Sequence, residues 1–238
     1  MTHAEHQGRP GPPPDAQQEP LAPYDPIPYG PPEPGVGPWQ GRWPDGPEYD
    51  PELLANGDRR NVVDRYRYWT MEAIVADLDT RRHPLHVAIE NWRHDFNIGT
   101  IVRSANAFAA ERVHIVGNRR WNRRGAMVTD RYQHLVHHPR VEDLADYLAR
   151  KQIPLFGIDN LPDSRPLESL ELPRRVCLLF GQEGPGLSEP ARRCCDATFS
   201  IAQFGSTRSI NASAAAAIAM HAWIRQHADL GSPQTWRG

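Results

Sequence analysis

Apolar and polar residues follow two alternating periods from residue 58 onward. In residues 58–82 the apolar positions recur at helical spacing beside many arginines, which predicts one or two helices with a mixed face. Short apolar runs then alternate with segments of helical periodicity. The runs predict strands over 84–90, 112–117, 154–159, 175–181 and 197–201, and the periodic segments predict helices over 98–110, 141–152 and 211–228, with a short helix capped by Ser188.

This alternation of strands and helices predicts an α/β fold, with a parallel sheet covered by helices on both faces. In sheets of this kind ligands bind beyond the carboxyl ends of the strands, in the loops that lead into helices. Three loops of this chain occupy such positions and have unusual residues. They are the candidates for a functional site.

The first loop opens the segment "HDFNIGTIVRSANAF", residues 94–108. Asn97 stands where a helix cap belongs, and Gly99 and Arg103, four residues apart, share one face of the predicted helix. Glycine in a first turn lowers helix stability by roughly 1 kcal/mol, so Gly99 indicates close approach of another backbone segment or of a ligand. A capped helix with a solvated arginine is the alternative interpretation.

The second loop is "FGQEGPGLS", residues 180–188, and the third lies in residues 200–220. Glycines in the second make a tight turn whose backbone can press against a ligand, although the signatures of triphosphate and dinucleotide sites are absent. Glu183 is its lone carboxylate, and accepting hydrogen bonds from loop amides is the simpler role. In the third loop Ser209 and Asn211 precede an alanine-rich turn that permits close packing, within the fold or against a second copy.

Composition separates residues 1–52 from the rest of the chain. Fifteen of the 24 prolines lie in the first 51 residues, and residues 1–52 contain nine Asp or Glu against two Arg, a net charge of −7. With so few aliphatic residues, this segment cannot bury enough surface to offset the entropy of ordering it, which predicts a disordered, acidic tail. We therefore expect a tail over 1–52, an Arg-rich helical extension over 53–83 and an α/β domain over 84–230.

Because the whole chain has a net charge of −2, residues 53–238 carry about +5, that is −2 minus −7. Arginine supplies nearly all of the cations, since Lys151 is the only lysine; phosphate recognition and GC-rich codon usage explain this bias equally well. Three cysteines are too few and too badly spaced for a disulfide framework or a zinc site. We expect a reduced, cytoplasmic protein that binds no metal and has no membrane span or signal peptide.

In this order the three loops resemble the SpoU, or TrmH-like, branch of the SPOUT RNA methyltransferases. The first motif of that family is similar to N-x-G-x-x-x-R-x-x-x-A-F, matched by the segment from Asn97 to Phe108. The second resembles F-G-x-E-x-x-G-L, matched over 180–187, and the third resembles I-P-M followed by S-L-N-x-S, matched by "IAQ" and "SINAS". Ala202 and Gln203 replace the usual proline and methionine, and Ala109 stands where a glycine often follows.

The resemblance implies a parallel sheet whose C-terminal segment forms a trefoil knot, a homodimer made through the closing helix, and S-adenosylmethionine as cofactor. The expected activity is methylation of a ribose 2′-hydroxyl in tRNA or rRNA. Arg103 would act at that hydroxyl and its neighbouring phosphate, with Asn97 and Asn211 orienting and Glu183 bracing the loops. The residues expected to line the cofactor site are Ile158, Gly181, Ile201, Ser209 and Ile210.

Two other functions stay open at this stage. One is an RNA-binding module of this fold with weak or no catalysis, which the changes at Ala202 and Gln203 allow. The other is an unrelated α/β nucleotide-binding enzyme, which the missing phosphate-loop signatures disfavour. The Arg-rich extension over 58–82 is the expected folded element for choosing the RNA.

Overall fold

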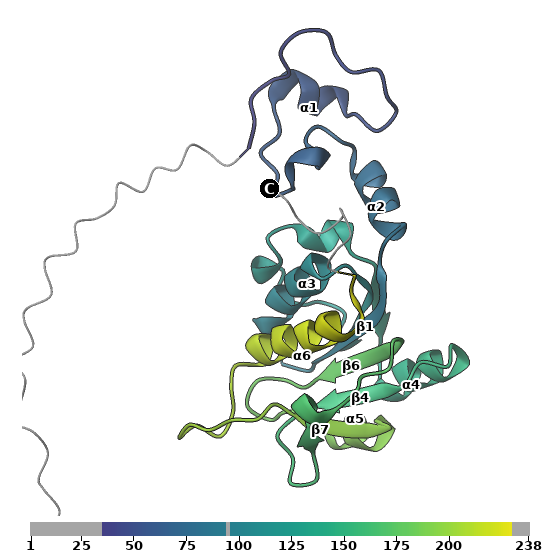
Figure 1. Ribbon diagram of the computed structural model, residues 1–238, viewed down its shortest axis with the longest axis vertical. Coiled ribbons are helices and arrows are strands. Elements are labelled where there is room, and N and C mark those ends of the chain that lie inside the picture. The colour runs from purple at the N-terminus through teal and green to yellow at the C-terminus, as the bar shows by residue number, and fades with distance from the viewer. Residues whose placement is uncertain (1–34, 94–95, 230–238) are drawn as a thin grey trace, which may run out of the picture. The chain divides into compact units, whose positions relative to one another are not determined.

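The computed structural model describes residues 35–93 and 96–229. Seven strands of this part form a parallel sheet in the order β3-β2-β1-β6-β4-β7-β5, which confirms the predicted α/β fold (Figure 1). The strands are β1 (His83–Asn91), β2 (Ala110–Gly117), β3 (Leu135–His138), β4 (Leu155–Ile158), β5 (Arg165–Pro166), β6 (Val176–Phe180) and β7 (Ala197–Ser200).

Helices cover both faces of this sheet, as the alternation of periods predicted (Figure 1). On one face α3 and α6 pack against residues such as Leu85 and Val87 of β1, and on the other α4 and α5 pack against Ala88. None of the helices in the described ranges is long and apolar enough to cross a membrane. The α-helices are α1 (Pro51–Asn56), α2 (Met71–Asp79), α3 (Asn97–Ala107), α4 (Val141–Arg150), α5 (Glu189–Cys194) and α6 (Ala212–His227), and the short 3-10 helices are η1 (Asp64–Tyr66), η2 (Arg124–Ala126), η3 (Thr129–Tyr132) and η4 (Leu167–Ser169).

Residues 35–52 differ from the expected tail, because they pack on the extension that follows. Val36 and Asp58 exchange two backbone hydrogen bonds of 2.9 Å, and the hydroxyl of Tyr68 donates to the carbonyl of Gly37 at 2.6 Å. Asp50 caps α1 through its side chain. The boundary expected near residue 52 is thus wrong for these residues, since backbone pairing orders a segment that has few aliphatic side chains. The rest of the predicted tail, residues 1–34, lies outside the described residues, as does residue 230 at the end of the predicted domain.

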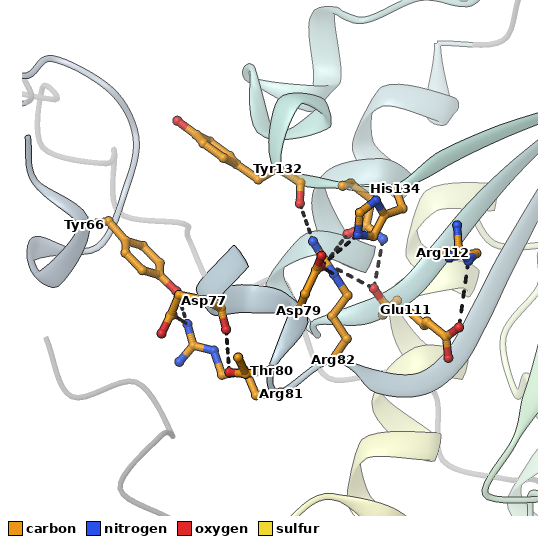
Figure 2. Close-up of polar contacts among 12 residues, drawn as sticks. Tyr66, Asp77, Asp79, Thr80, Arg81, Arg82, Glu111, Arg112, Tyr132 and His134 are labelled. Atoms are coloured by element: carbon orange, nitrogen blue, oxygen red, sulfur yellow. Dashed lines mark hydrogen bonds and ion pairs between the residues drawn. The ribbon is translucent and has the colours of Figure 1, made fainter. Parts of the chain in front are cut away.

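The extension is attached to the sheet by ion pairs at the end of α2 (Figure 2). Asp79 accepts hydrogen bonds from Arg82 Nε at 2.6 Å and from His134 Nε2 at 2.8 Å, and Arg82 also donates to the carbonyl of Tyr132 at 2.7 Å. A small apolar cluster of Tyr66, Ile74 and Tyr132 joins the extension to η3. Residues 58–82 of the extension form the 3-10 helix η1 and the α-helix α2, which agrees with the one or two helices expected there.

Three buried histidines form a hydrogen-bonded row across β1, β2 and β3. His86 Nδ1 lies 2.9 Å from His114 Nε2, and His114 Nδ1 lies 2.9 Å from His138 Nε2. The central ring, His114, uses both of its nitrogens in the row, and as a neutral imidazole it donates with one and accepts with the other. Burial lowers the pKa of His86 to about 4 and that of His114 further, so the row stays neutral in the folded protein.

We expect deletion of residues 1–50 to lower Tm by roughly 5 °C or more, because it removes several hydrogen bonds worth about 1 kcal/mol each. The measurement is thermal unfolding followed by circular dichroism. Deletion of residues 1–34 is the matched control and should leave Tm unchanged. Equal Tm values for both deletions and the full chain would contradict the packing of residues 35–50.

The histidine row predicts that stability falls as pH drops below about 6.5, where histidines of the unfolded chain take up protons and these buried ones do not. The pKa values of these histidines are lower in the folded protein than in the unfolded chain. The folded state is therefore fully stable above the unfolded pKa of about 6.5 and loses stability as the pH falls toward 4. His86 and His114 each contribute a slope of up to about 1.4 kcal/mol per pH unit in this window.

Urea unfolding between about pH 7.5 and pH 5 measures this dependence. His114→Gln keeps a donor and an acceptor but cannot titrate, so it should flatten the slope. His221→Gln, a change at an exposed histidine outside the row, should leave the slope intact. The same slope for both variants would refute the assignment.

Candidate active site

A pocket of about 180 Å³ opens at the carboxyl ends of β4, β6 and β7, and two of the three predicted functional loops, those after β6 and β7, line it. Loops after each of these strands and the first turn of α6 form its walls. The five residues expected at the cofactor site all lie in its lining: Ile158, Gly181, Ile201, Ser209 and Ile210. Loops that are distant in sequence therefore meet in one concave site.

The loop after β6 keeps its shape by backbone contact with itself. Gln182 and Gly186 exchange backbone hydrogen bonds of 3.2 and 3.0 Å, and a Cβ on Gly181 would lie 2.1 Å from the Gly186 carbonyl carbon. Gly186 has φ +70°, and a Cβ there would lie 2.4 Å from Asp159 Oδ2. The same carboxylate accepts a hydrogen bond from the amide of Leu187 at 2.8 Å. The glycines therefore let this loop fold onto β4.

Three motif side chains form one hydrogen-bonded group at the pocket. The amide nitrogen of Asn97 donates to Glu183 Oε2, and that of Asn211 donates to Glu183 Oε2 at 3.1 Å and to Asn97 Oδ1 at 2.9 Å. Asn211 also caps α6, because its Oδ1 accepts from the amide of Ser213 at 3.0 Å. The group thus joins the starts of α3 and α6 to the loop after β6.

Asn97 corrects one expectation from the sequence. It is the first residue of α3 and not its N-cap, since Phe96 holds that position and makes no side-chain capping bond. The Asn97 side chain is directed to Glu183 and Asn211 instead. A polar side chain at the start of a helix can either cap that helix or contact a neighbouring loop, and the sequence alone does not distinguish these two roles.

Gly99 and Arg103 share a face of α3, as predicted, but they have different surroundings. Gly99 is buried, and a Cβ there would lie 2.8 Å from the amide nitrogen of Ala126 and 2.9 Å from that of Gly125. Close approach of another backbone segment therefore explains this glycine. Arg103 is exposed and is not among the pocket-lining residues, and its side chain makes no hydrogen bond or ion pair with any other described residue.

Glu90 is a structural residue of this site that the sequence reasoning missed. It is fully buried at the end of β1, where Oε2 accepts from the amide of Ser188 at 2.8 Å and Oε1 from its hydroxyl at 2.6 Å. The indole of Trp92 donates to the same carboxylate at 2.8 Å. Ser188 caps α5, which confirms its predicted role. The sequence did contain a signal for this role, namely a charged residue near the end of an otherwise apolar strand.

The described ranges contain no group of three or more His, Cys, Asp or Glu residues that could hold a metal ion. Cysteine is also a poor nucleophile in this fold. Cys177 is fully buried, and burial raises the pKa of Cys195 to about 12, so its thiol stays protonated near neutral pH.

Fold and site together define an α/β protein with a ligand pocket at the carboxyl edge of a parallel sheet. The sequence pattern of the SpoU rRNA Methylase family matches residues 84–221, and the chain belongs to this family. The match covers β1 through most of α6 and includes all three motif loops.

Curated relatives have names from tRNA and rRNA methylation. The tRNA (guanosine(18)-2'-O)-methyltransferase of Escherichia coli is 25% identical over 166 residues, which are 68% of this chain and 72% of that protein. An uncharacterized tRNA/rRNA methyltransferase of Mycolicibacterium smegmatis is 34% identical over 175 residues, 69% of this chain and 54% of that protein.

A solved structure has the same fold with a cofactor bound. The SpoU methyltransferase AviRb from Streptomyces viridochromogenes, in complex with AdoMet, is 26% identical with a TM-score of 0.55. The alignment covers 63% of this chain and 60% of that one, so this chain spans less than two thirds of AviRb. The TrmH/SpoU tRNA modifying enzyme of A. aeolicus, at 18% identity and a TM-score of 0.58 over 66% of this chain and 81% of that one, has a similar fold.

Two glycines of the loop after β6 give a matched pair of variants. Gly184 and Gly186 both have positive φ, of +91° and +70°, but a Cβ at Gly184 meets nothing within 4 Å while one at Gly186 meets the Asp159 carboxylate. Gly184→Ala should therefore cost only about 1 kcal/mol of backbone strain, and Gly186→Ala should cost at least about 1 kcal/mol more. Urea unfolding measures both. Equal losses would mean that the loop does not need its contact with Asp159.

Proposed function

We propose that this chain is an S-adenosylmethionine-dependent methyltransferase that acts on a ribose 2′-hydroxyl of tRNA or rRNA. The observation that carries the proposal is a pocket that two motif loops line and that the third motif loop joins through the hydrogen bonds among Asn97, Glu183 and Asn211. Family membership, the 2′-O-methyltransferase name of the Escherichia coli relative and the AdoMet bound to AviRb support the same activity.

The pocket suits a cofactor with an apolar body and polar ends. Ile158, Ile201 and Ile210 offer apolar surface, as a nucleoside site needs, and the glycine loop offers backbone groups. Gln203 also lines the pocket, and its Oε1 is buried without a hydrogen-bond partner among the described residues. Since buried acceptors are rarely left unpaired, a ligand with an N–H donor fits this position.

The protein contributes to the reaction by aligning the reacting atoms and by stabilising the charge that develops on the oxygen. The cofactor, when bound, supplies a methyl group on a positively charged sulfur, and aligning a hydroxyl with it gives much of the rate. Arg103 binds the neighbouring phosphate and stabilises the oxygen as it loses its proton to phosphate or water. A guanidinium does not itself deprotonate in proteins, so Arg103 is no general base. Asn97 and Asn211 orient the hydroxyl, and Glu183 braces the loops.

Base methylation fits these residues less well than ribose methylation. Methylation of a base carbon requires a cysteine adduct, and the three cysteines lie outside the pocket lining, with Cys177 fully buried. An arginine, two asparagines and a serine suit a phosphate and its adjacent sugar hydroxyl instead. This set favours the 2′-oxygen as the acceptor.

We further propose that residues 84–230 form the catalytic domain, that its C-terminal segment forms a trefoil knot, and that the protein works in the cytoplasm as a homodimer through α6. The support for the dimer is the alanine-rich start of α6 and the exposed Ile218 on the same helix, 44% accessible. Small residues at a helix surface let another helix approach closely, and a homodimer would place Arg103 of one subunit near the pocket of the other.

The product distinguishes this function from other RNA methylation. We expect labelled methyl from S-adenosylmethionine to enter bulk tRNA or rRNA at alkali-resistant linkages, because methylation blocks the hydroxyl that attacks the phosphate. An RNA with a single 2′-deoxy sugar at the mapped target should accept no methyl group. Transfer to the deoxy substrate at a normal rate would identify a base as the acceptor. No transfer to any RNA would leave an RNA-binding module without catalysis.

Arg103→Ala should leave S-adenosylmethionine affinity unchanged, because Arg103 does not line the pocket. It should lower kcat by two or more orders of magnitude, on the scale of one transition-state donor. Calorimetry and single-turnover kinetics measure the two effects. Lost cofactor binding would overturn this division of roles. Mixing Arg103→Ala with Asn211→Ala should restore part of the activity if one site takes residues from both subunits.

A further inference from the structure

Two groups of arginines in this chain differ in their partners. In the extension, Arg60, Arg65, Arg81 and Arg82 pair with the carboxylates of Asp58, Asp77 and Asp79. Figure 2 shows Arg81 and Arg82 turned toward these acidic side chains. A paired guanidinium has its hydrogen-bonding groups and its charge already compensated. The extension, expected to select the RNA, uses its arginines for its own stability instead.

The second group lies in the loop after β2. Residues 119–124 contain four arginines in six positions, and residues 117–128 contain no Asp or Glu. Arg119, Arg120 and Arg124 are exposed, and their side chains make no hydrogen bond or ion pair with any other residue in the described ranges. Arg123 is the exception in the loop, with an ion pair of 3.3 Å to Asp130.

The backbone of this loop is fixed, so its arginines are displayed from a rigid base. The side chain of Asn91 donates to the carbonyls of Asn118 at 2.7 Å and Arg120 at 2.9 Å. On its other side the loop runs into η2, whose backbone lies against the bare face of Gly99. A preformed arrangement of this kind reduces the entropy lost on binding.

The loop is also connected to the pocket. Asn118 Nδ2 donates to the carbonyl of Trp92 at 2.9 Å, and the amide of Trp92 donates to Oε1 of Gln182, a pocket-lining residue, at 3.1 Å. Arg103 extends from the same face of α3 as Gly99, which contacts the loop. The arginines and the pocket thus lie along the carboxyl edge of neighbouring strands, with α3 beside both.

We propose that Arg119, Arg120 and Arg124 bind the phosphate backbone of the RNA and lead it to the pocket. The inference rests on the proposed function for its substrate class. Guanidinium groups bind phosphate oxygens through paired N–H donors, and three uncompensated ones beside a ribose-modifying site suit consecutive phosphates of one strand. Such contacts add affinity without reading sequence, so the choice of target nucleotide lies elsewhere.

The test compares two triple variants with the same change of charge. Arg119, Arg120 and Arg124 are changed to Gln in one, and in the other Arg150, Arg174 and Arg175, which are exposed at the opposite, amino edge of the sheet. The Kd for labelled bulk tRNA is measured over a range of salt concentrations. The loop variant should bind roughly tenfold more weakly or worse, with a slope of log Kd on log salt reduced by about 2 to 3. The control should change the slope by less than about 1.

A third variant with Lys at the three loop positions keeps the charge and should retain most of the salt slope, which separates charge from misfolding. Calorimetry should give the same S-adenosylmethionine affinity for all variants, because none of these residues lines the pocket. Equal Kd values and slopes for the loop and control variants would overturn the proposal. If instead the loop variant binds RNA weakly but the wild type transfers no methyl group, the surface stands and the proposed function fails.

Discussion

The carboxylate of Glu183 is the point on which the arrangement of the site depends. It accepts hydrogen bonds from the side chains of Asn97 and Asn211, which begin α3 and α6 respectively. Without this acceptor the loop after β6 would lose its hydrogen bonds to the first residue of α3 and to the residue that caps α6. Each motif is thus fixed by the other two. This explains why the three motifs in order predict the fold and the site, whereas each motif alone does not.

Two further carboxylates, those of the buried Glu90 and the half-buried Asp159, extend this bracing into the fold. Glu90 holds the start of α5 and the Trp92 ring, and Asp159 holds the loop after β6 against β4. Both lie at the carboxyl ends of their strands, where the pocket opens. Hydrogen bonds from backbone amides to a carboxylate are strong and geometrically strict. The pocket wall is therefore a preorganised surface, which suits catalysis by alignment.

The sequence predicted the elements that have a clear period. Eight strands and helices of the α/β core lie where apolar periodicity put them, and the cofactor residues proposed by resemblance share one pocket. The strand Leu135–His138 was missed because half of it is histidine, and His138 is buried only as part of the hydrogen-bonded row. Residues 35–52 were misassigned because backbone pairing, which leaves no apolar pattern, orders them. The ion-pair partners of each arginine could not be predicted from the sequence either, since they depend on tertiary contacts.

The central claim is that the loops after β4, β6 and β7 form a single binding site, so that one ligand contacts all of them at once. Hydrogen–deuterium exchange of the full chain, with and without S-adenosylmethionine, tests it directly. The account predicts slower exchange in the loops after β4, β6 and β7 together, with half-saturation at the same cofactor concentration in each. Protection of only one loop, or protection at the opposite edge of the sheet with these loops unchanged, would contradict it.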